Sequence, residues 1–113
     1  MRLRDALLGL TALAAVLPAA GCGTSDAAAP MATTRVTMAK SYRFEPRAIA
    51  VPVGATVTWT NDDNFTHSVQ VDAQEDHTVE PGERVSIAFS TAGTYHYVCR
   101  LHRRDMDGEV VVG

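Results

Sequence analysis

The sequence is poor in cysteine, in net charge and in helical pattern, and each shortage excludes a class of protein. Its 113 residues include only two cysteines, Cys22 and Cys99, which are too far apart for the C-x-x-C-H signature of haem attachment. Ten basic and thirteen acidic residues leave a formal charge of −3, which argues against a nucleic-acid partner. There is no internal repeat, and beyond residue 32 no segment shows the period of an amphipathic helix.

The longest apolar run lies near the N-terminus, where residues 6–17 follow Arg2 and Arg4. As a helix, these 12 residues would span about 18 Å, well short of the roughly 30 Å hydrocarbon core of a membrane. A basic start followed by a short apolar segment is typical of a secretory signal peptide. We therefore predict that residues 1–21 direct export and do not belong to the folded domain.

A cysteine ends this segment, in the stretch LPAAGC that closes at Cys22. The stretch resembles the bacterial lipobox, whose cysteine is lipidated and becomes the new N-terminus, although Ala19 stands where leucine is usual. Cleavage after the A-x-A site at residues 27–29 is the alternative. We favour lipidation, because Cys22 otherwise has no role in a chain with two cysteines. A disulfide from Cys22 to Cys99 is a further alternative, but it would start in a flexible tail and use up the thiol that has metal-like neighbours. We therefore expect a lipid anchor as the only membrane contact, on the outer face of the bacterial membrane or in the periplasm.

The rest of the chain divides into a tether and one small domain. Residues 22–32 consist mainly of Gly, Ser, Thr, Ala, Asp and Pro, as flexible tethers do. In residues 33–113, Val57 and Trp59 alternate with threonines, a period of two that buries one face of a strand. Similar short runs separated by turn signals predict an all-β sandwich of about seven to eight strands. The expected strands are residues 35–39, 48–51, 55–61, 67–71, 84–90, 94–99 and 109–112.

Three side chains near the C-terminus form the most informative motif. Cys99, His102 and Met106 follow a C-x2-H-x3-M spacing between two expected strands. A thiolate, an imidazole and a thioether together favour copper, whereas zinc rarely accepts a thioether. A cysteine nucleophile with a histidine base is the alternative, but no third group stands at a recognisable position.

The motif needs one more ligand, and three other histidines are present. His67 stands where a turn enters an expected strand, whereas His77 lies in an acidic stretch that we expect to be a solvated loop. His96 alternates with two tyrosines on the strand that leads to Cys99, and so faces away from the thiol. We favour His67, because two histidines, one cysteine and a weak methionine make a specific copper pattern.

These residues carry a resemblance to a known family. The segments FEPRAIAVPVGATVTWTNDDNFTHSV and PGERVSIAFSTAGTYHYVCRLHRRDMDGEVVV resemble the two halves of cupredoxins, the small blue copper proteins of the plastocyanin and amicyanin type. The resemblance implies a Greek-key sandwich with one copper per chain. It also implies that His67, Cys99 and His102 are equatorial ligands and Met106 the axial one.

The ligand loop departs from both of these types in two ways. Three residues separate His102 from Met106, where amicyanin-like proteins usually have two and plastocyanin-like proteins four. Leu101 replaces the proline that many relatives carry before the second histidine. Because proline has no N–H, we expect Leu101 to donate a hydrogen bond to the thiolate that those relatives lack.

The expected function is one-electron transfer by a monomer, and not enzyme catalysis. Copper oxidases and nitrite reductases need further copper sites and place histidine beside the cysteine, where this chain has Val98 and Arg100. A copper carrier or sequestering lipoprotein with the same ligands is the alternative. Arg100, Arg103 and Arg104 surround His102, and we expect them to dock a redox partner protein through an acidic surface.

Overall fold

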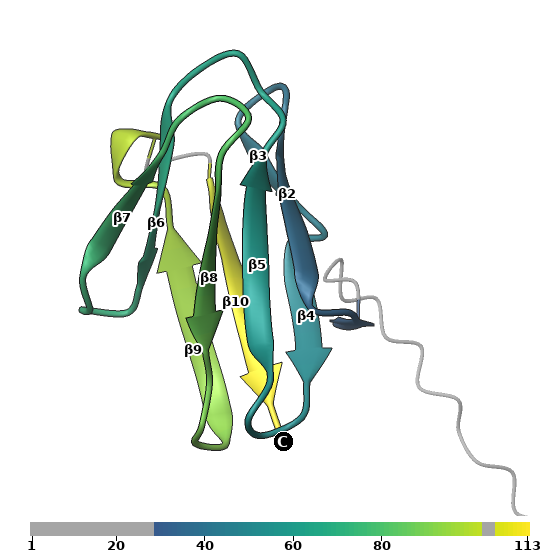
Figure 1. The fold of residues 1–113 in the computed structure, drawn as a ribbon. Coiled ribbons are helices and arrows are strands. Elements are labelled where there is room, and N and C mark those ends of the chain that lie inside the picture. Colours follow the sequence, from purple (N-terminus) through teal and green to yellow (C-terminus); the bar gives the residue numbers. More distant parts are fainter. Residues whose placement is uncertain (1–28, 103–105) are drawn as a thin grey trace, which may run out of the picture.

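The computed structural model describes residues 29–102 and 106–113, which form ten strands in two facing sheets (Figure 1). The strand order is β1-β4-β10-β9-β6-β7 in the larger sheet and β3-β2-β5-β8 in the smaller. No helix in the described residues is long and apolar enough to cross a membrane. The elements are β1 (Met31–Ala32), β2 (Arg35–Ala39), β3 (Arg43–Glu45), β4 (Ala48–Val51), β5 (Thr56–Asn61), β6 (His67–Val71), β7 (Asp76–Val79), β8 (Arg84–Ala88), β9 (Gly93–Val98), the 3-10 helix η1 (Arg100–His102) and β10 (Asp107–Val112).

The core lies between the inner faces of the two sheets. On β5, Val57 and Trp59 are fully buried while Thr58 and Thr60, which alternate with them, are partly exposed, as the period of two predicts. Trp59 packs edge-on against Tyr97 of β9, with ring centroids 5.1 Å apart. Gly108 of β10 leaves room for that ring, because an added Cβ would overlap Tyr97. The contact joins both sheets close to the end of β9.

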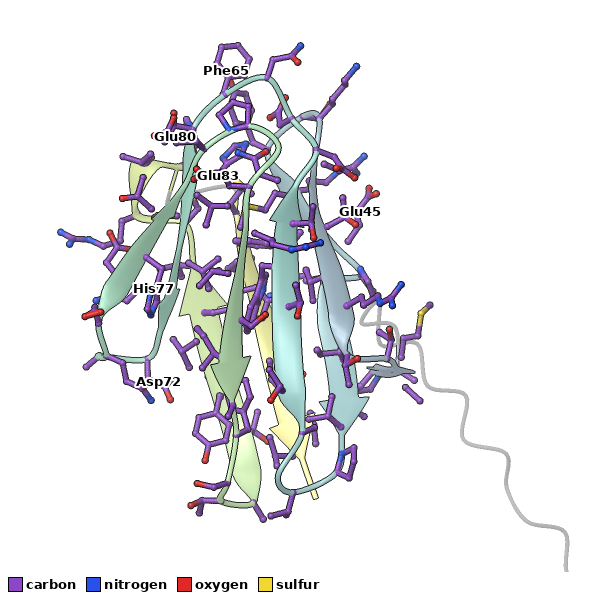
Figure 2. All side chains as sticks on the ribbon, in the orientation of Figure 1. Glu45, Phe65, Asp72, His77, Glu80 and Glu83 are labelled. Atoms are coloured by element: carbon purple, nitrogen blue, oxygen red, sulfur yellow. The ribbon has the colours of Figure 1, made fainter. Side chains whose placement is uncertain are left out.

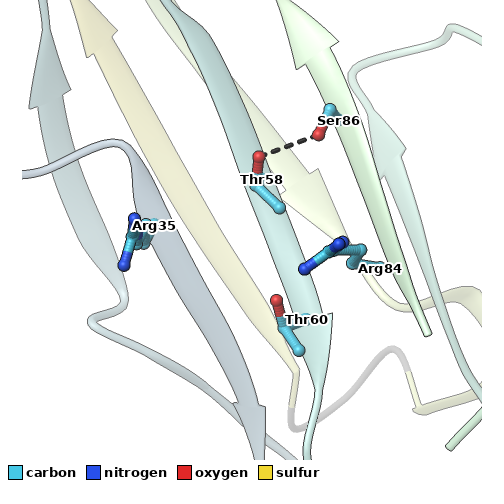
Figure 3. A pocket seen from close by; sticks show the side chains of 5 residues that line it. All are labelled: Arg35, Thr58, Thr60, Arg84 and Ser86. Atoms are coloured by element: carbon cyan, nitrogen blue, oxygen red, sulfur yellow. Dashed lines mark hydrogen bonds between the residues drawn. The ribbon is translucent and has the colours of Figure 1, made fainter. Parts of the chain in front are cut away.

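The outer face of the smaller sheet is polar (Figure 3). Arg35, Thr58, Thr60, Arg84 and Ser86 line an open depression there, on β2, β5 and β8. The Thr58 and Ser86 hydroxyl oxygens lie 2.8 Å apart across the β5–β8 pair. This is the solvated face of an antiparallel pair whose other face is packed.

The fold class is confirmed, and each of the seven predicted strands is present. The described residues form ten strands instead of seven to eight. The additional ones are β1, β3 and β7, short strands of two to four residues each that the sequence did not predict. Our expectation of a solvated loop around His77 is wrong, because this residue lies on β7, where it is partly buried and opposite Val69 of β6. A charged edge strand lacks the apolar alternation on which strand prediction depends.

Candidate metal centre

The end of the sandwich drawn uppermost in Figure 1 brings two of the predicted ligands together. β6 and β9 are antiparallel neighbours, with Gln70 opposite Val98, so the start of β6 lies beside the end of β9. His67 opens β6 and Cys99 directly follows β9. Both side chains are fully buried, and His67 Nδ1 lies 3.8 Å from Cys99 Sγ. The sheet register therefore sets this contact.

Backbone hydrogen bonds close the loop that carries the other two candidates. The His102 N–H donates to the Cys99 carbonyl (3.1 Å), and the Met106 N–H donates to the His102 carbonyl (3.0 Å). The Cys99 N–H donates back to the Met106 carbonyl (3.1 Å). Met106 is fully buried, and His102 is partly exposed with its ring centroid 5.4 Å from that of His67. The intervening residues, with Arg103 and Arg104, lie outside the described part.

The Cys99 sulfur accepts hydrogen bonds from Ser68, which follows His67 on β6. The Ser68 N–H donates to Sγ at 3.3 Å, and Ser68 Oγ lies 3.9 Å from the same sulfur. Ser68 Oγ accepts the N–H of Arg100 at 2.9 Å, which leaves its own hydrogen free to point toward the sulfur. The N–H and O–H of Ser68 therefore stabilise negative charge on the Cys99 sulfur. The sequence suggested Leu101 for this role, but the bonds that the structure shows come from β6.

A buried carboxylate orients His67 from the side opposite Cys99. His67 Nε2 lies 2.8 Å from Asp63 Oδ2, and Asp63 is only 6% exposed. The Asn64 N–H donates to the second carboxylate oxygen at 2.7 Å. Both bonds lower the pKa of Asp63, the one from His67 more strongly. Because an ionised carboxylate only accepts, Nε2 carries a hydrogen, and Nδ1 is the ring nitrogen that faces Cys99.

The loop that holds this carboxylate is itself fixed by Asn61, the last residue of β5. Asn61 Oδ1 accepts the N–H of Asp63 at 2.8 Å. Its amide Nδ2 donates to the carbonyls of Phe65 (2.8 Å) and Val79 (2.9 Å). The sequence interpretation missed Asn61 and Asp63. The only available signal was a carboxylate four residues before His67, a spacing too common in loops to be decisive.

The remaining histidines lie elsewhere in the described structure. His96 is exposed on β9, with Nδ1 3.9 Å from the Glu109 carboxylate on β10. His77 is on β7, at the side of the sandwich (Figure 2). Neither belongs to the group formed by His67, Cys99 and His102.

The chemistry of the four candidate donors decides which metal they would fit. Within residues 29–102 and 106–113, no three His, Cys, Asp or Glu side chains converge closely enough to define a metal site, and this includes His67, Cys99 and His102. Met106 is not one of these four residue types, but its buried thioether is a further candidate donor. A thioether is the ligand that zinc and hard cations accept least. One thiol, two imidazoles and one thioether fit copper.

Comparison with known proteins supports the same class. Residues 10–112 match the family model of the cupredoxin-like domain, so the chain belongs to the cupredoxin-like family. Amicyanin-alpha from Methylorubrum extorquens is 32% identical over 114 residues, covering 95% of this chain and 92% of that protein. Plastocyanin from Scenedesmus fuscus is 36% identical over 83 residues, 61% of this chain and 85% of the relative. An amicyanin variant solved in its oxidised state superposes with a TM-score of 0.65 at 34% identity, over 70% of this chain and 80% of the other.

The Asp63–His67 bond generates a prediction for the metal-free domain. Long-range ¹H–¹⁵N NMR should show the His67 proton on Nε2, protected from exchange with water. Asp63→Ala should remove that protection and lower metal affinity by about 10–100-fold, the usual effect of losing a partner that orients a ligand. Asp62→Ala, which removes the neighbouring exposed carboxylate, should change neither. A His67 resonance unchanged in Asp63→Ala would show that the carboxylate does not orient the ring.

Proposed function

We propose that this chain is an electron carrier that holds one copper ion through His67, Cys99, His102 and Met106. The observation that carries the proposal is the buried contact of 3.8 Å between His67 Nδ1 and Cys99 Sγ at the end of a cupredoxin-like sandwich. Bound copper would supply a one-electron couple, Cu(II)/Cu(I). Plastocyanin and amicyanin, the blue copper proteins that the sequence resembles, support this assignment.

The residues around the site would keep its donors in place as the charge changes. His67 and Cys99 are attached to paired strands, and Asp63 and Ser68 hold the imidazole and the sulfur. Fast electron transfer needs donors that move little between oxidation states, and side chains on paired strands meet that need. His102 is partly exposed, so its edge would admit the electron from a partner.

The first test is the visible spectrum of the soluble domain after addition of Cu(II). A thiolate ligand gives intense charge transfer, so we expect a blue or green protein with one copper per chain. Cys99→Ser should abolish the colour, while His77→Ala and His96→Ala should keep it. Voltammetry separates the alternative function, since a carrier of copper would lose the metal on each reduction whereas an electron carrier would give a reversible wave. Bleaching by His77→Ala but not by His67→Ala would refute the ligand set.

Met106 allows a second test of the ligand set. An axial thioether forms a long, weak bond, so Met106→Leu should retain copper and colour. The potential should rise, because removing a donor destabilises Cu(II) more than Cu(I). Voltammetry and copper analysis of the same sample measure both effects. Complete loss of copper would show that the loop with its three-residue spacing binds the metal differently from our proposal.

We further propose that the end of the molecule around His102 docks an acidic redox partner. Arg100 is exposed there, with its guanidinium 4.0 Å from Asp76, so part of its charge is already offset. The proposal therefore depends mainly on Arg103 and Arg104, which lie outside the described residues. Electrostatic steering acts on the association rate and is screened over about 8 Å at physiological salt.

Charge reversal tests the docking proposal. Electron transfer to the natural partner should slow as ionic strength rises, and Arg103→Glu with Arg104→Glu should slow it further without altering the visible spectrum. Arg35→Glu with Arg84→Glu makes the same charge change on the outer face of the smaller sheet, and should have a much smaller effect. Rates that ignore both salt and the reversals at 103 and 104 would exclude this docking mode.

For localisation, we propose an exported protein anchored by lipid at Cys22, which precedes the described residues. The support is the LPAAGC stretch after a short apolar run. Mass spectrometry of the native N-terminus should find a diacylated or triacylated Cys22. An unmodified N-terminus at residue 29 or 30 would instead indicate ordinary cleavage.

A further inference from the structure

Tyr42 lies in the connection from β2 to β3 and packs against both histidines of the metal centre. Its ring centroid is 4.4 Å from that of His102, with the planes tilted by 49°. The same ring meets His67 edge-on, with centroids 5.9 Å apart. No residue of this connection was expected to belong to the site, because it is far in sequence from every ligand.

The backbone at this position is held in an unfavourable conformation. Ser41 has a φ of 77° and Tyr42 a φ of 58°, so two successive residues with side chains occupy the left-handed region. A bulky residue there is uncommon, and such outliers persist where surrounding contacts stabilise them. The contacts of the Tyr42 ring are of this kind. The strained turn brings a large aromatic ring to the metal centre.

A third ring supports Tyr42 on its outer side. The Phe65 centroid lies 5.8 Å from that of Tyr42, and Phe65 is exposed at the same end of the sandwich (Figure 2). Among the described residues, the aromatic neighbours of the His102 ring are Tyr42 and His67. His102 ends the short 3-10 helix η1, and these two ring contacts are therefore available to orient its imidazole.

We propose that Tyr42 is a positioning residue, which holds the imidazole of His102 in its ligand orientation and keeps water from the exposed edge of the centre. This inference rests on the proposed copper function. Two effects follow from it. Copper should leave the site slowly because the His102 ring cannot swing away, and the potential should be raised because water would stabilise the more highly charged Cu(II) site.

Three variants separate this role from a general effect on packing. Tyr42→Leu removes the ring, Tyr42→Phe keeps it without the hydroxyl, and Phe65→Leu makes the same change from aromatic to aliphatic one ring further from His102. In the metal-free protein, the His102 ring protons should show a ring-current shift that disappears only in Tyr42→Leu. In the reduced copper protein, Tyr42→Leu should transfer copper to a Cu(I) chelator about tenfold faster, equivalent to about 1.4 kcal/mol and close to the upper end for an aromatic pair. Its potential should fall.

The outcomes distinguish this proposal from the function on which it rests. If Tyr42→Phe behaves like wild type and Tyr42→Leu differs in ring-current shift, copper transfer and potential, the positioning role is supported. If Tyr42→Leu matches wild type in copper transfer and potential while both proteins are blue, the positioning role is refuted and the copper function stands. If wild type itself gives no charge-transfer band with Cu(II), both proposals are refuted.

Discussion

The pairing of β6 with β9 is the constraint on which the rest of the site depends. Antiparallel register brings the first residue of β6 beside the residue that follows β9, and so places His67 Nδ1 3.8 Å from Cys99 Sγ. A shift of one residue would turn either side chain to the other face of the sheet. Tyr97 of β9 packs across the core against Trp59 of the other sheet, which opposes such a shift of β9. The packing of the sandwich therefore also determines the geometry of the site.

Around that contact, each donor is fixed by a different element. Asp63 holds the ring of His67, Ser68 donates to the sulfur, and the Cys99–Met106 backbone bonds close the ligand loop. Buried polar groups lower stability unless they are paired, and here each of these is. The same bonds that satisfy the buried groups also orient the donors. This arrangement suits the proposed copper centre, which would change charge while its donors keep their positions.

The sequence was sufficient to predict the fold class, and the four donors in our proposal were also chosen from it. The alternation of apolar and polar residues around Trp59 and the C-x2-H-x3-M spacing each lie within a short segment. Such local patterns can be recognised in one sequence without a structure. The supporting residues could not be found in this way. Asp63 acts from a loop that Asn61 holds, and Ser68 acts through a contact that the β6–β9 register sets. Tyr42 reaches the histidines through a left-handed turn that no short motif marks. β7 was missed for a related reason, since pairing with β6 makes it a strand.

The central claim is that the sulfur of Cys99 binds copper. X-ray absorption at the copper and sulfur edges of the oxidised protein measures that bond directly. We predict a short copper–sulfur contact, with mixing of copper and sulfur orbitals visible before the sulfur edge, and the loss of both features in Cys99→Ser. A copper environment of nitrogen and oxygen alone, with the Cys99 thiol still open to alkylation after unfolding without reductant, would contradict the account.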